Sequence, residues 1–547
     1  MLTRCRIQLI IVATAALLFI PGLGAVHLFD WDEINFAEIA REMVVSGDWL
    51  RPQMHFEPFH EKPPLFMWLQ AASMSVFGVG EFAARFSNAV CGILTLLVLF
   101  RIGEQLRGRV FGMLWALAYI GSILPHLYFR SGIIDPWFNL FIFLGLHTII
   151  TLVQSDRTRH PNAINAGSHV YASLAGLYLG LAVLTKGPVG LLVPGLVLAT
   201  YLAWGKFKPY LGWRQIGVIT VSTCIVVGAW ALVDLLRNGP DFMVAFFWRQ
   251  VAMLTTEDAG HGGFFGYHFV VLLIGCFPAS VFAIQELLKP TRTDDAAQND
   301  LRRWMVILFW VVLLLFSIVS TKIVHYSSLC YFPLTYLAAL QLERVWKKRE
   351  AFGWSRFALG GIGTVIALLV IAIPFFGMNI DMIRPLFAQD HFALANLDAD
   401  VHWTGMEVVA GSVLLIALIS GHVLHLRGRY RQAVVAIFCG GALFVTTTLF
   451  FFISNIEGYS QRAAVEFFAS KAGERCWLIT KGYKSYVPEF YGRVSEPRPA
   501  EEVLVHNAVE RPVYLSCKIT AVDEVEALGT FTEIYRKNGF VFYYRQP

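Results

Sequence analysis

A group of acidic side chains marks the most polar part of an otherwise apolar chain. Asp30, Asp32 and Glu33 lie within four residues, before a segment, 34–46, whose apolar residues recur at helical spacing. A carboxylate at a helix start acts as a cap, but one would suffice. Three together near an apolar surface should repel and raise one another's pKa. We therefore favour function over capping, and take Asp32 and Glu33 as candidate catalytic residues on an amphipathic helix lying on a membrane surface.

A second polar motif, Glu61-Lys62-Pro63-Pro64, precedes an apolar helix predicted over residues 65–77. Proline suits the first helical turn, so Lys62 falls at a helix N-terminus, where the helix dipole disfavours a cation. An anion bound there would be held by the ammonium and by free backbone N–H groups together. The motif predicts a lipid-phosphate site. The equally weighted alternative is a lysine that extends to lipid headgroups.

Further ionisable residues fall at the ends of long apolar stretches, where a charge is costly and tends to be functional. Arg130 and Asp135 flank the outer end of one stretch. They could instead form a structural ion pair with each other or with a helix end. Lys186 and Lys322 could each meet a phosphate or an acidic headgroup, and Tyr326 could hydrogen-bond the same anion as Lys322.

The elements that carry these residues are predicted to be membrane-spanning helices. Of the 547 residues, 56% are hydrophobic and 15% are charged, whereas soluble domains carry about 25% charged residues. The net charge of +5 is too small to indicate nucleic-acid binding. Thirteen stretches are long and apolar enough to cross a bilayer: 7–25, 82–100, 110–125, 134–153, 170–185, 187–204, 215–236, 267–287, 304–319, 324–341, 357–376, 406–425 and 433–453.

The distribution of basic residues predicts the orientation of these spans, because cytoplasmic connections are rich in Lys and Arg. Every second connection is basic: Arg101, Arg107 and Arg109; Arg157 and Arg159; Lys206, Lys208 and Arg214; Lys289, Arg292, Arg302 and Arg303; Arg344, Lys347, Lys348 and Arg349; and Arg427, Arg429 and Arg431. The N-terminus is therefore expected inside. The outer side would hold loop 26–81, the connections 126–133, 237–266 and 377–405, Lys186, Thr321–Lys322 and the tail.

Two domains are expected: a helical membrane domain, 1–453, with loop 26–81 in it, and an extracytoplasmic α/β domain, 454–547. In the tail we predict a helix over 461–471, strands over 476–480, 513–517, 530–535 and 540–545, and a hairpin turn at Asn538-Gly539. A packing or lid role is expected for the tail, which contains no nucleophile–base arrangement. A disulfide between Cys476 and Cys517 is unfavoured, because parallel strands would hold the two sulfurs too far apart.

Four motifs in the first outer loop occur in the order and spacing of a known family. They are Asp32-Glu33 with Ala37-Glu38-Ile39 and Arg41-Glu42-Met43, then Ser46-Gly47-Asp48-Trp49, Glu61-Lys62-Pro63-Pro64-Leu65, and Phe77-Gly78-Val79 with Glu81-Phe82-Ala83-Ala84-Arg85. The chain resembles the bacterial lipid A aminoarabinose transferases, a branch of the protein O-mannosyltransferase-like (dolichyl-phosphate-mannose-protein mannosyltransferase-like) enzymes with the GT-C fold. Weaker matches continue through Arg130, Asp135, Lys186 and Lys322, and through Trp248-Arg249.

The resemblance implies an inner-membrane glycosyltransferase, acting as a monomer on the periplasmic face. It would move a hexose or pentose from an undecaprenyl-phosphate donor to lipid A, another glycolipid or a protein hydroxyl. Asp32 would be the base or would orient the acceptor, and Lys62, with Lys322, Tyr326 and Arg130, would bind the donor phosphate. Glu61 and His261, with His268 as the competing match, would hold a divalent metal such as zinc, although two protein ligands make a weak site.

One position departs from the family pattern. The aminoarabinose enzymes usually have arginine two residues after the Asp-Glu pair, and this chain has Asn35. Losing a bidentate phosphate contact weakens the case for that donor and for a lipid A acceptor, but leaves the reaction class unchanged. Two alternatives stay open: a lipid or sugar transporter, which the missing internal repeat disfavours, and a non-catalytic glycolipid-binding protein.

Overall fold

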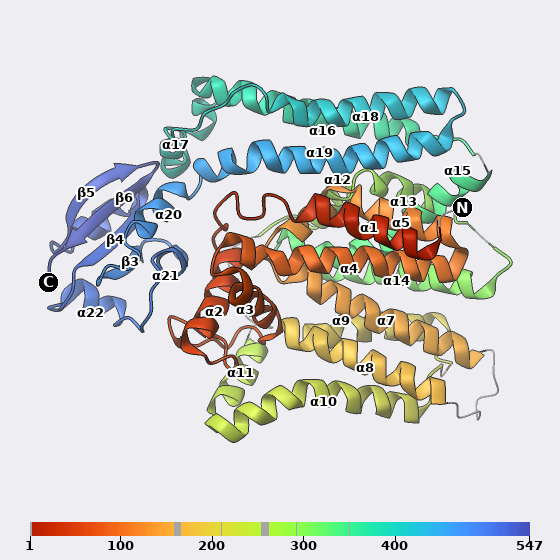
Figure 1. Ribbon diagram of the computed structural model, residues 1–547, viewed down its shortest axis with the longest axis horizontal. Helices are drawn as coiled ribbons and strands as arrows, with labels where there is room; N and C mark the ends of the chain where they lie inside the picture. The colour runs from red at the N-terminus through yellow and green to blue at the C-terminus, as the bar shows by residue number, and fades with distance from the viewer. Residues whose placement is uncertain (1–2, 158–165, 209, 253–261, 292, 349) are drawn as a thin grey trace.

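Long helices lie side by side along the long axis of the molecule, and a small sheet lies at one end of them (Figure 1). The computed structural model describes residues 3–157, 166–208, 210–252, 262–291, 293–348 and 350–547. The N-terminus lies at the opposite end from the sheet and the C-terminus (Figure 1). The predicted architecture, a mostly helical polytopic membrane protein with a small C-terminal α/β region, is confirmed.

Eight helices within the described ranges are long and apolar enough to cross a membrane, or ten if each of two bent pairs is one span. The eight are α4 (Glu81–Arg107), α7 (Asp135–Arg157), α8 (Ala166–Lys186), α10 (Trp213–Asn238), α14 (Ala296–Ile318), α16 (Ser355–Met378), α18 (Val408–Leu426) and α19 (Tyr430–Gly458). The bent pairs are α5 (Arg109–Ile120) with α6 (Ile123–Leu127) and η1 (Tyr128–Arg130), at 83°, and α12 (Tyr267–Gly275) with α13 (Ala279–Leu288), at 116°.

Every stretch predicted to span the membrane coincides with helix, but three of these helices fall short of a full span. Helices α1 (Arg4–Phe19) and α9 (Val189–Trp204) have 16 residues each, which is less than a bilayer requires. Helix α15 (Tyr331–Lys348) contains Glu343, Arg344 and Lys347 in its last turns. Within the described residues, length and composition therefore qualify eight to ten of the thirteen predicted crossings.

The first outer loop lies at the end of the bundle that carries the sheet (Figure 1). Helix α2 (Asp32–Ser46) ends at Gly47, which has a φ of 75°, and α3 (Leu65–Phe77) follows, both as predicted. Strands β1 (Gln53–Met54) and β2 (Glu57–Pro58) form a short antiparallel pair between them. Helix α2 is buried on most of its surface, so it is more enclosed than a helix lying on a membrane surface. Further short helices between the spans are α11 (Asp241–Ala252), η2 (Val324–Cys330), η3 (Ile380–Met382), η4 (Arg384–Phe387) and α17 (His391–Asn396).

The tail contains a four-stranded sheet of order β3-β4-β6-β5. Its elements are β3 (Trp477–Lys481), β4 (Val513–Lys518), β5 (Thr532–Lys537), β6 (Phe540–Arg545), α20 (Arg462–Ala469), α21 (Val487–Tyr491), α22 (Glu501–His506), η5 (Ile519–Ala521) and α23 (Val522–Glu526). The predicted turn between β5 and β6 is present, since Asn538 and Gly539 both have positive φ. Strands β3 and β4 are parallel, with Lys481 opposite Cys517. Cys476 and Cys517 are therefore at opposite ends of the pair and are free thiols.

Two hydrophobic cores position the outer segments. One fills the helical bundle. The other joins α2, α3 and the start of α4 to the tail, through residues such as Ile39, Phe66, Phe468 and Phe542. The boundary predicted between 453 and 454 lies inside α19, which continues to Gly458. The first outer loop and the tail thus pack against each other.

Candidate active site

Asp32 is the first residue of α2, and its carboxylate is 49% exposed. The preceding residue, Trp31, has a φ of 73°, which a bulky side chain rarely adopts. Asp32 Oδ2 lies 3.8 Å from His325 Nδ1. This carboxylate can therefore meet a substrate from outside while it remains next to a residue of the bundle.

His325, in η2, lies between two carboxylates. Its Nε2 is 3.9 Å from Asp135 Oδ2, while its Nδ1 faces Asp32. Both separations exceed a direct hydrogen bond, but both are ion-pair contacts when the imidazole is protonated. Sequence reasoning missed His325, although it stands between Lys322 and Tyr326, which were selected. The available signal was its place next to Tyr326, although the sequence predicted both residues at the start of the span 324–341.

Asp135 and Lys186 form a buried ion pair between helix ends. Asp135 begins α7, Lys186 ends α8, and Lys186 Nζ lies 2.7 Å from Asp135 Oδ1. The Lys186 ammonium also lies 5.7 Å from the ring centre of Tyr326. Asp135 Oδ2 is buried without a hydrogen-bond partner in the described part of the chain. Four predicted site residues, Asp32, Asp135, Lys186 and Tyr326, are thus brought together around His325.

Glu33 points away from this group and contacts Arg85 through both carboxylate oxygens, at 2.9 and 2.7 Å. It also accepts a hydrogen bond from the Gly132 N–H, and Arg85 donates to the carbonyls of Leu23, Val26 and His27. Burial opposes ionisation of Glu33, but Arg85 and these hydrogen bonds hold its pKa below the usual value. The prediction that clustered carboxylates raise one another's pKa is therefore wrong for Glu33, whose contacts favour a structural role.

Asp30 faces the tail. Its Oδ1 accepts hydrogen bonds from the backbone N–H groups of Trp31 at 2.8 Å and Tyr486 at 3.1 Å. Burial raises the pKa of Asp30, and a hydrogen bond from Ser485 opposes the rise. The three neighbouring carboxylates have three different environments because the chain turns sharply at Trp31.

The Glu61-Lys62 motif lies just before α3. Pro64 is the N-cap of α3 and has no side-chain cap bond, which leaves the helix N-terminus available to an anion. Glu61 Oε1 forms an ion pair with Arg249 Nη2 of α11 at 2.6 Å, and Gln250 donates to the Glu61 carbonyl. Helix α11 therefore fixes the motif from one side.

The predicted metal ligands are not assembled in the described part of the chain. His261 lies outside the described residues, as do Arg159, Arg292 and Arg349 of the predicted inner connections. The competing ligand, His268, is buried in α12, and neither of its ring nitrogens has a hydrogen-bond partner among the described residues. The ranges described contain no group of three or more His, Cys, Asp or Glu side chains arranged to hold a metal ion.

Two of the predicted phosphate-binding cations donate to backbone carbonyls at helix ends. Arg130 donates to the carbonyls of Leu18, in the last turn of α1, and of Pro21, just after it, both at 2.7 Å. Lys322 Nζ donates to the carbonyls of Phe316, Ser317 and Val319 at the end of α14. Cations satisfy free carbonyls at a helix C-terminus and complement its dipole. These contacts favour the helix-end alternative for Arg130 and a structural role for Lys322.

A cavity of about 580 Å³ lies beside His325, between the end of α1 and the outer part of α19. Most of its lining is apolar, including Leu17, Leu449 and Phe450, and its polar lining includes Arg130 and His325. An apolar chain in this cavity could therefore approach His325, which lies between Asp32 and Asp135.

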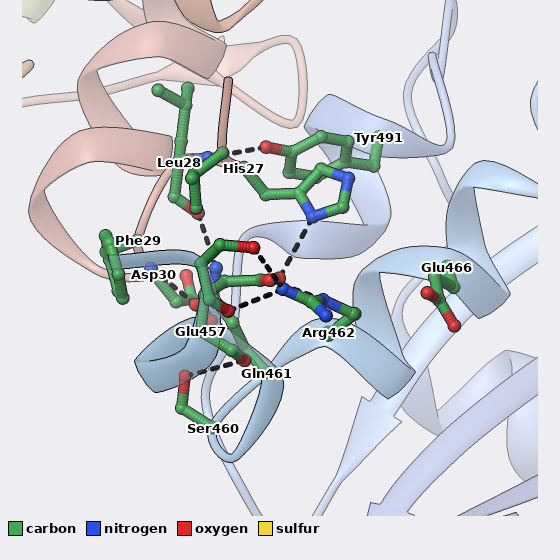
Figure 2. Close-up of polar contacts among 12 residues, drawn as sticks. His27, Leu28, Phe29, Asp30, Glu457, Ser460, Gln461, Arg462, Glu466 and Tyr491 are labelled. Carbon is green, nitrogen blue, oxygen red and sulfur yellow. Dashed lines mark hydrogen bonds and ion pairs between the residues drawn. The ribbon is translucent and has the colours of Figure 1, made fainter. Parts of the chain in front are cut away.

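The loop before α2 is held by the junction between α19 and the tail (Figure 2). Gln461 accepts a hydrogen bond from the Asp30 N–H at 2.9 Å and donates to the Leu28 carbonyl at 2.5 Å. His27 faces Glu457 at 2.9 Å, and Glu457 also pairs with Arg462 at 2.6 Å. The tail thus fixes the backbone that leads into Asp32.

Comparison with known proteins supports the resemblance noted in the sequence. A family model described as dolichyl-phosphate-mannose-protein mannosyltransferase matches residues 61–233. An undecaprenyl phosphate-alpha-4-amino-4-deoxy-L-arabinose arabinosyl transferase from Enterobacter sp. is 28% identical over 373 residues, 67% of this chain and 65% of the relative. The protein of that name from Pectobacterium atrosepticum is 28% identical over 433 residues, 75% of each chain. The match thus spans slightly less than two thirds of the Enterobacter relative.

Two solved structures share the fold over nearly the whole chain. The crystal structure of ArnT from Cupriavidus metallidurans bound to undecaprenyl phosphate superposes with a TM-score of 0.76 at 21% identity, covering 99% of this chain and 98% of that one. Its apo structure gives a TM-score of 0.74, also at 21% identity, covering 98% and 97%. The arrangement of spans, outer helices and tail is therefore that of the ArnT fold.

Proposed function

We propose that this chain, which has the ArnT fold and resembles the aminoarabinose transferases in sequence, is a membrane glycosyltransferase. Its donor would be a sugar on undecaprenyl phosphate, with aminoarabinose as the first candidate. Its acceptor would be an envelope glycolipid, with lipid A as the first candidate, because the relatives carry those names. The observation that carries the proposal is the group of Asp32, His325, Asp135 and Lys186 beside an apolar cavity.

The proposed reaction is a direct displacement at the anomeric carbon. An acceptor oxygen forms the new bond to that carbon as the bond from the carbon to the donor phosphate oxygen breaks, which inverts the configuration. The phosphate keeps the bonding electrons and stays on its lipid. Lys62 and the N-terminus of α3 stabilise the charge that develops on it.

Asp32 orients the acceptor in this scheme. An acceptor hydroxyl would transfer its proton to the Asp32 carboxylate, which is within reach of outside solvent. An acceptor phosphate is already ionised at neutral pH and needs no base. His325 would hold Asp32 toward the bundle, and the pair of Asp135 and Lys186 would in turn fix His325.

We further propose that the site and the tail face the periplasm, in the inner membrane of a bacterium. The support is the charge pattern, because the basic connections such as Arg427–Arg431 alternate with the segments that form the site. The tail would act as a cover for the first outer loop, consistent with the core the two share.

The proposal is tested in cells that make the donor lipid and lack their own transferase. Asp32→Asn and Lys62→Ala are each expected to lower the modified lipid A, measured by mass spectrometry, by about 10²-fold or more relative to the unsubstituted chain. Asp398→Asn is the matched control, since it makes the same chemical change on an exposed outer loop. Full modification by both site variants would refute the assignment, and unmodified lipid A with the unsubstituted chain would refute this donor–acceptor pair.

A further inference from the structure

Trp31 is an exposed aromatic residue in an unfavourable backbone conformation next to Asp32. Its φ is 73° and its side chain is 47% exposed, although it caps a helix that is otherwise mostly buried. Strained residues of this kind cluster at functional sites. A role in binding accounts for both the strained backbone and the exposed indole.

A lysine from the tail lies over this indole. Lys484 Nζ is 5.5 Å from the ring centre of Trp31 and 5.4 Å from that of Tyr486, within the range of a cation–π contact. The residue itself is exposed. Two aromatic faces therefore fix the position of an ammonium group that solvent and ligands can reach.

The tail loop and Trp31 are held together by Asp30. One oxygen of the Asp30 carboxylate accepts hydrogen bonds from the backbone N–H groups of both Trp31 and Tyr486. Lys484 and Trp31, 453 positions apart in the sequence, are therefore fixed relative to each other before any ligand binds. Such preorganisation lowers the entropic cost of binding.

This pair lies at the start of α2, where Trp31 is the N-cap and Asp32 is the first helical residue. Asp32 follows Trp31 directly, and Asn35 lies one helical turn later on the same face of α2. Asn35 Oδ1 is buried and has no hydrogen-bond partner within the described ranges. The exposed indole and the fixed ammonium thus stand next in the chain to the carboxylate that is proposed to meet the acceptor.

We propose that Trp31 and Lys484 form a subsite for the phosphorylated sugar headgroup of the acceptor glycolipid. The Lys484 ammonium binds the phosphate, and the apolar face of a sugar ring packs on the Trp31 indole. The inference rests on the proposed function for the identity of the acceptor. The subsite is assigned to the acceptor because the proposed reaction already places the donor phosphate at Lys62 and the N-terminus of α3.

Kinetics with two acceptors test the subsite, using lipid A that carries its phosphates and lipid A from which they have been removed. With the phosphorylated acceptor, Lys484→Gln is expected to raise the acceptor KM about tenfold or more while kcat and the donor KM change little. Lys484→Arg should retain most of the affinity. Trp31→Gly, which suits a positive φ, should raise the KM for both acceptors. Lys537→Gln is the matched control, because Lys537 is an exposed tail lysine that pairs with Glu466.

A binding measurement separates this inference from the proposed reaction. The chain in lipid nanodiscs is titrated with each lipid A, and the bound lipid is counted by native mass spectrometry. The subsite is supported if binding depends on the phosphates, is lost in Lys484→Gln and is kept in Lys537→Gln. If that pattern is found but no sugar is transferred, only the proposed reaction fails. Equal binding of the two lipids, or equal binding by Lys484→Gln and the unsubstituted chain, overturns the subsite whether or not transfer occurs.

Discussion

At the scale of single residues, neighbouring carboxylates acquire different properties from their separate partners. Asp30 is buried against the tail, Asp32 faces His325 with half of its side chain exposed, and Glu33 is fixed by Arg85. A carboxylate that meets an arginine and several N–H groups is stabilised as an anion and is poorly placed to take a proton. Asp32 is therefore the carboxylate of the three that is suited to act on a substrate.

His325 is expected to position Asp32. In His325→Gln we predict that kcat falls about 10²-fold, because the contact that holds Asp32 toward the bundle is lost, while the donor KM changes little. Initial rates with purified protein in detergent would measure both values. His391→Gln is the control, since it makes the same change at an exposed histidine of α17. An unchanged kcat for His325→Gln would remove His325 from the mechanism.

The buried pair of Asp135 and Lys186 allows structural and functional roles to be separated. Lys186→Met is expected to destabilise the protein by about 3 kcal/mol, because it leaves the buried Asp135 carboxylate without its cation, and Asp135→Asn by less, because Lys186 is partly exposed. The double variant should recover much of that loss, as measured by thermal unfolding in detergent. We predict that transfer does not recover with stability. A double variant as active as the unsubstituted chain would make the pair purely structural.

At the scale of elements, the loop before α2 depends on the α19–α20 junction. Gln461 binds the backbone on both sides of Phe29, and the Tyr491 hydroxyl accepts a hydrogen bond from the Leu28 N–H at 2.7 Å. A short loop held at successive backbone groups has little freedom to move. The junction therefore determines where α2 begins and where Asp32 points.

Gln461→Leu is expected to loosen this loop without unfolding the chain. We predict that kcat falls about tenfold or more, because Asp32 loses its fixed position, and that the KM values change less. Ser460→Ala is a neighbouring control, since its hydroxyl donates to the Glu457 carbonyl and does not touch the loop. Equal kcat values for the two variants, measured alongside their melting temperatures, would argue against positioning by Gln461.

Helix α2 also carries a buried carboxyl group that should make stability depend on pH. Burial, and then the charge of Glu38, raise the pKa of Glu42 from 4.5 to about 8. The folded state therefore binds a proton more tightly than the unfolded state does. The stabilisation is complete below pH 4.5 and is lost as pH rises toward about 8, by roughly 1 kcal/mol per pH unit.

Thermal unfolding between pH 5 and 8.5 would measure this dependence. The melting temperature of the unsubstituted chain is expected to fall across this range. Glu42→Gln, which imitates the protonated carboxyl group, should show a flatter profile. Parallel profiles for the two proteins would show that Glu42 does not titrate in this window.

At the scale of the whole molecule, the site is assembled from segments that are distant in sequence. Asp32 comes from the first outer loop, Asp135 and Lys186 from two adjacent helix ends, His325 from η2, and Lys484 from the tail. These segments meet at one end of the helical bundle, where the sheet also lies (Figure 1). One face of the membrane would thus carry the whole site.

Orientation in the membrane can be tested with single introduced cysteines. Glu502 lies in the tail, and Arg429 lies in the connection between α18 and α19 at the opposite end (Figure 1); both are exposed. A membrane-impermeant thiol reagent applied to intact spheroplasts should label Glu502→Cys and not Arg429→Cys, above the background of the unsubstituted chain. Preferential labelling of Arg429→Cys over Glu502→Cys in intact spheroplasts would reverse the proposed orientation.

The sequence by itself determined the local properties of this protein. Apolar length predicts helices such as α4 and α19, Gly47 ends α2 because glycine accepts a positive φ, and Asn538-Gly539 forms a tight turn for the same reason. The motifs around Asp32 and Lys62 also predict the resemblance to the aminoarabinose transferases, which the comparisons confirm. Each of these properties depends on residues close together in the chain.

Tertiary structure alone decided which charges meet. Arg130 and Lys322 looked like phosphate ligands, but the helix ends packed against them offer carbonyls, while His325 became central because Asp32 and Asp135 converge on it. Electrostatic interactions act through space, so a side chain's role depends on partners that can lie hundreds of positions away, as Lys484 does from Trp31. The spacing of residues along one chain does not encode those distances.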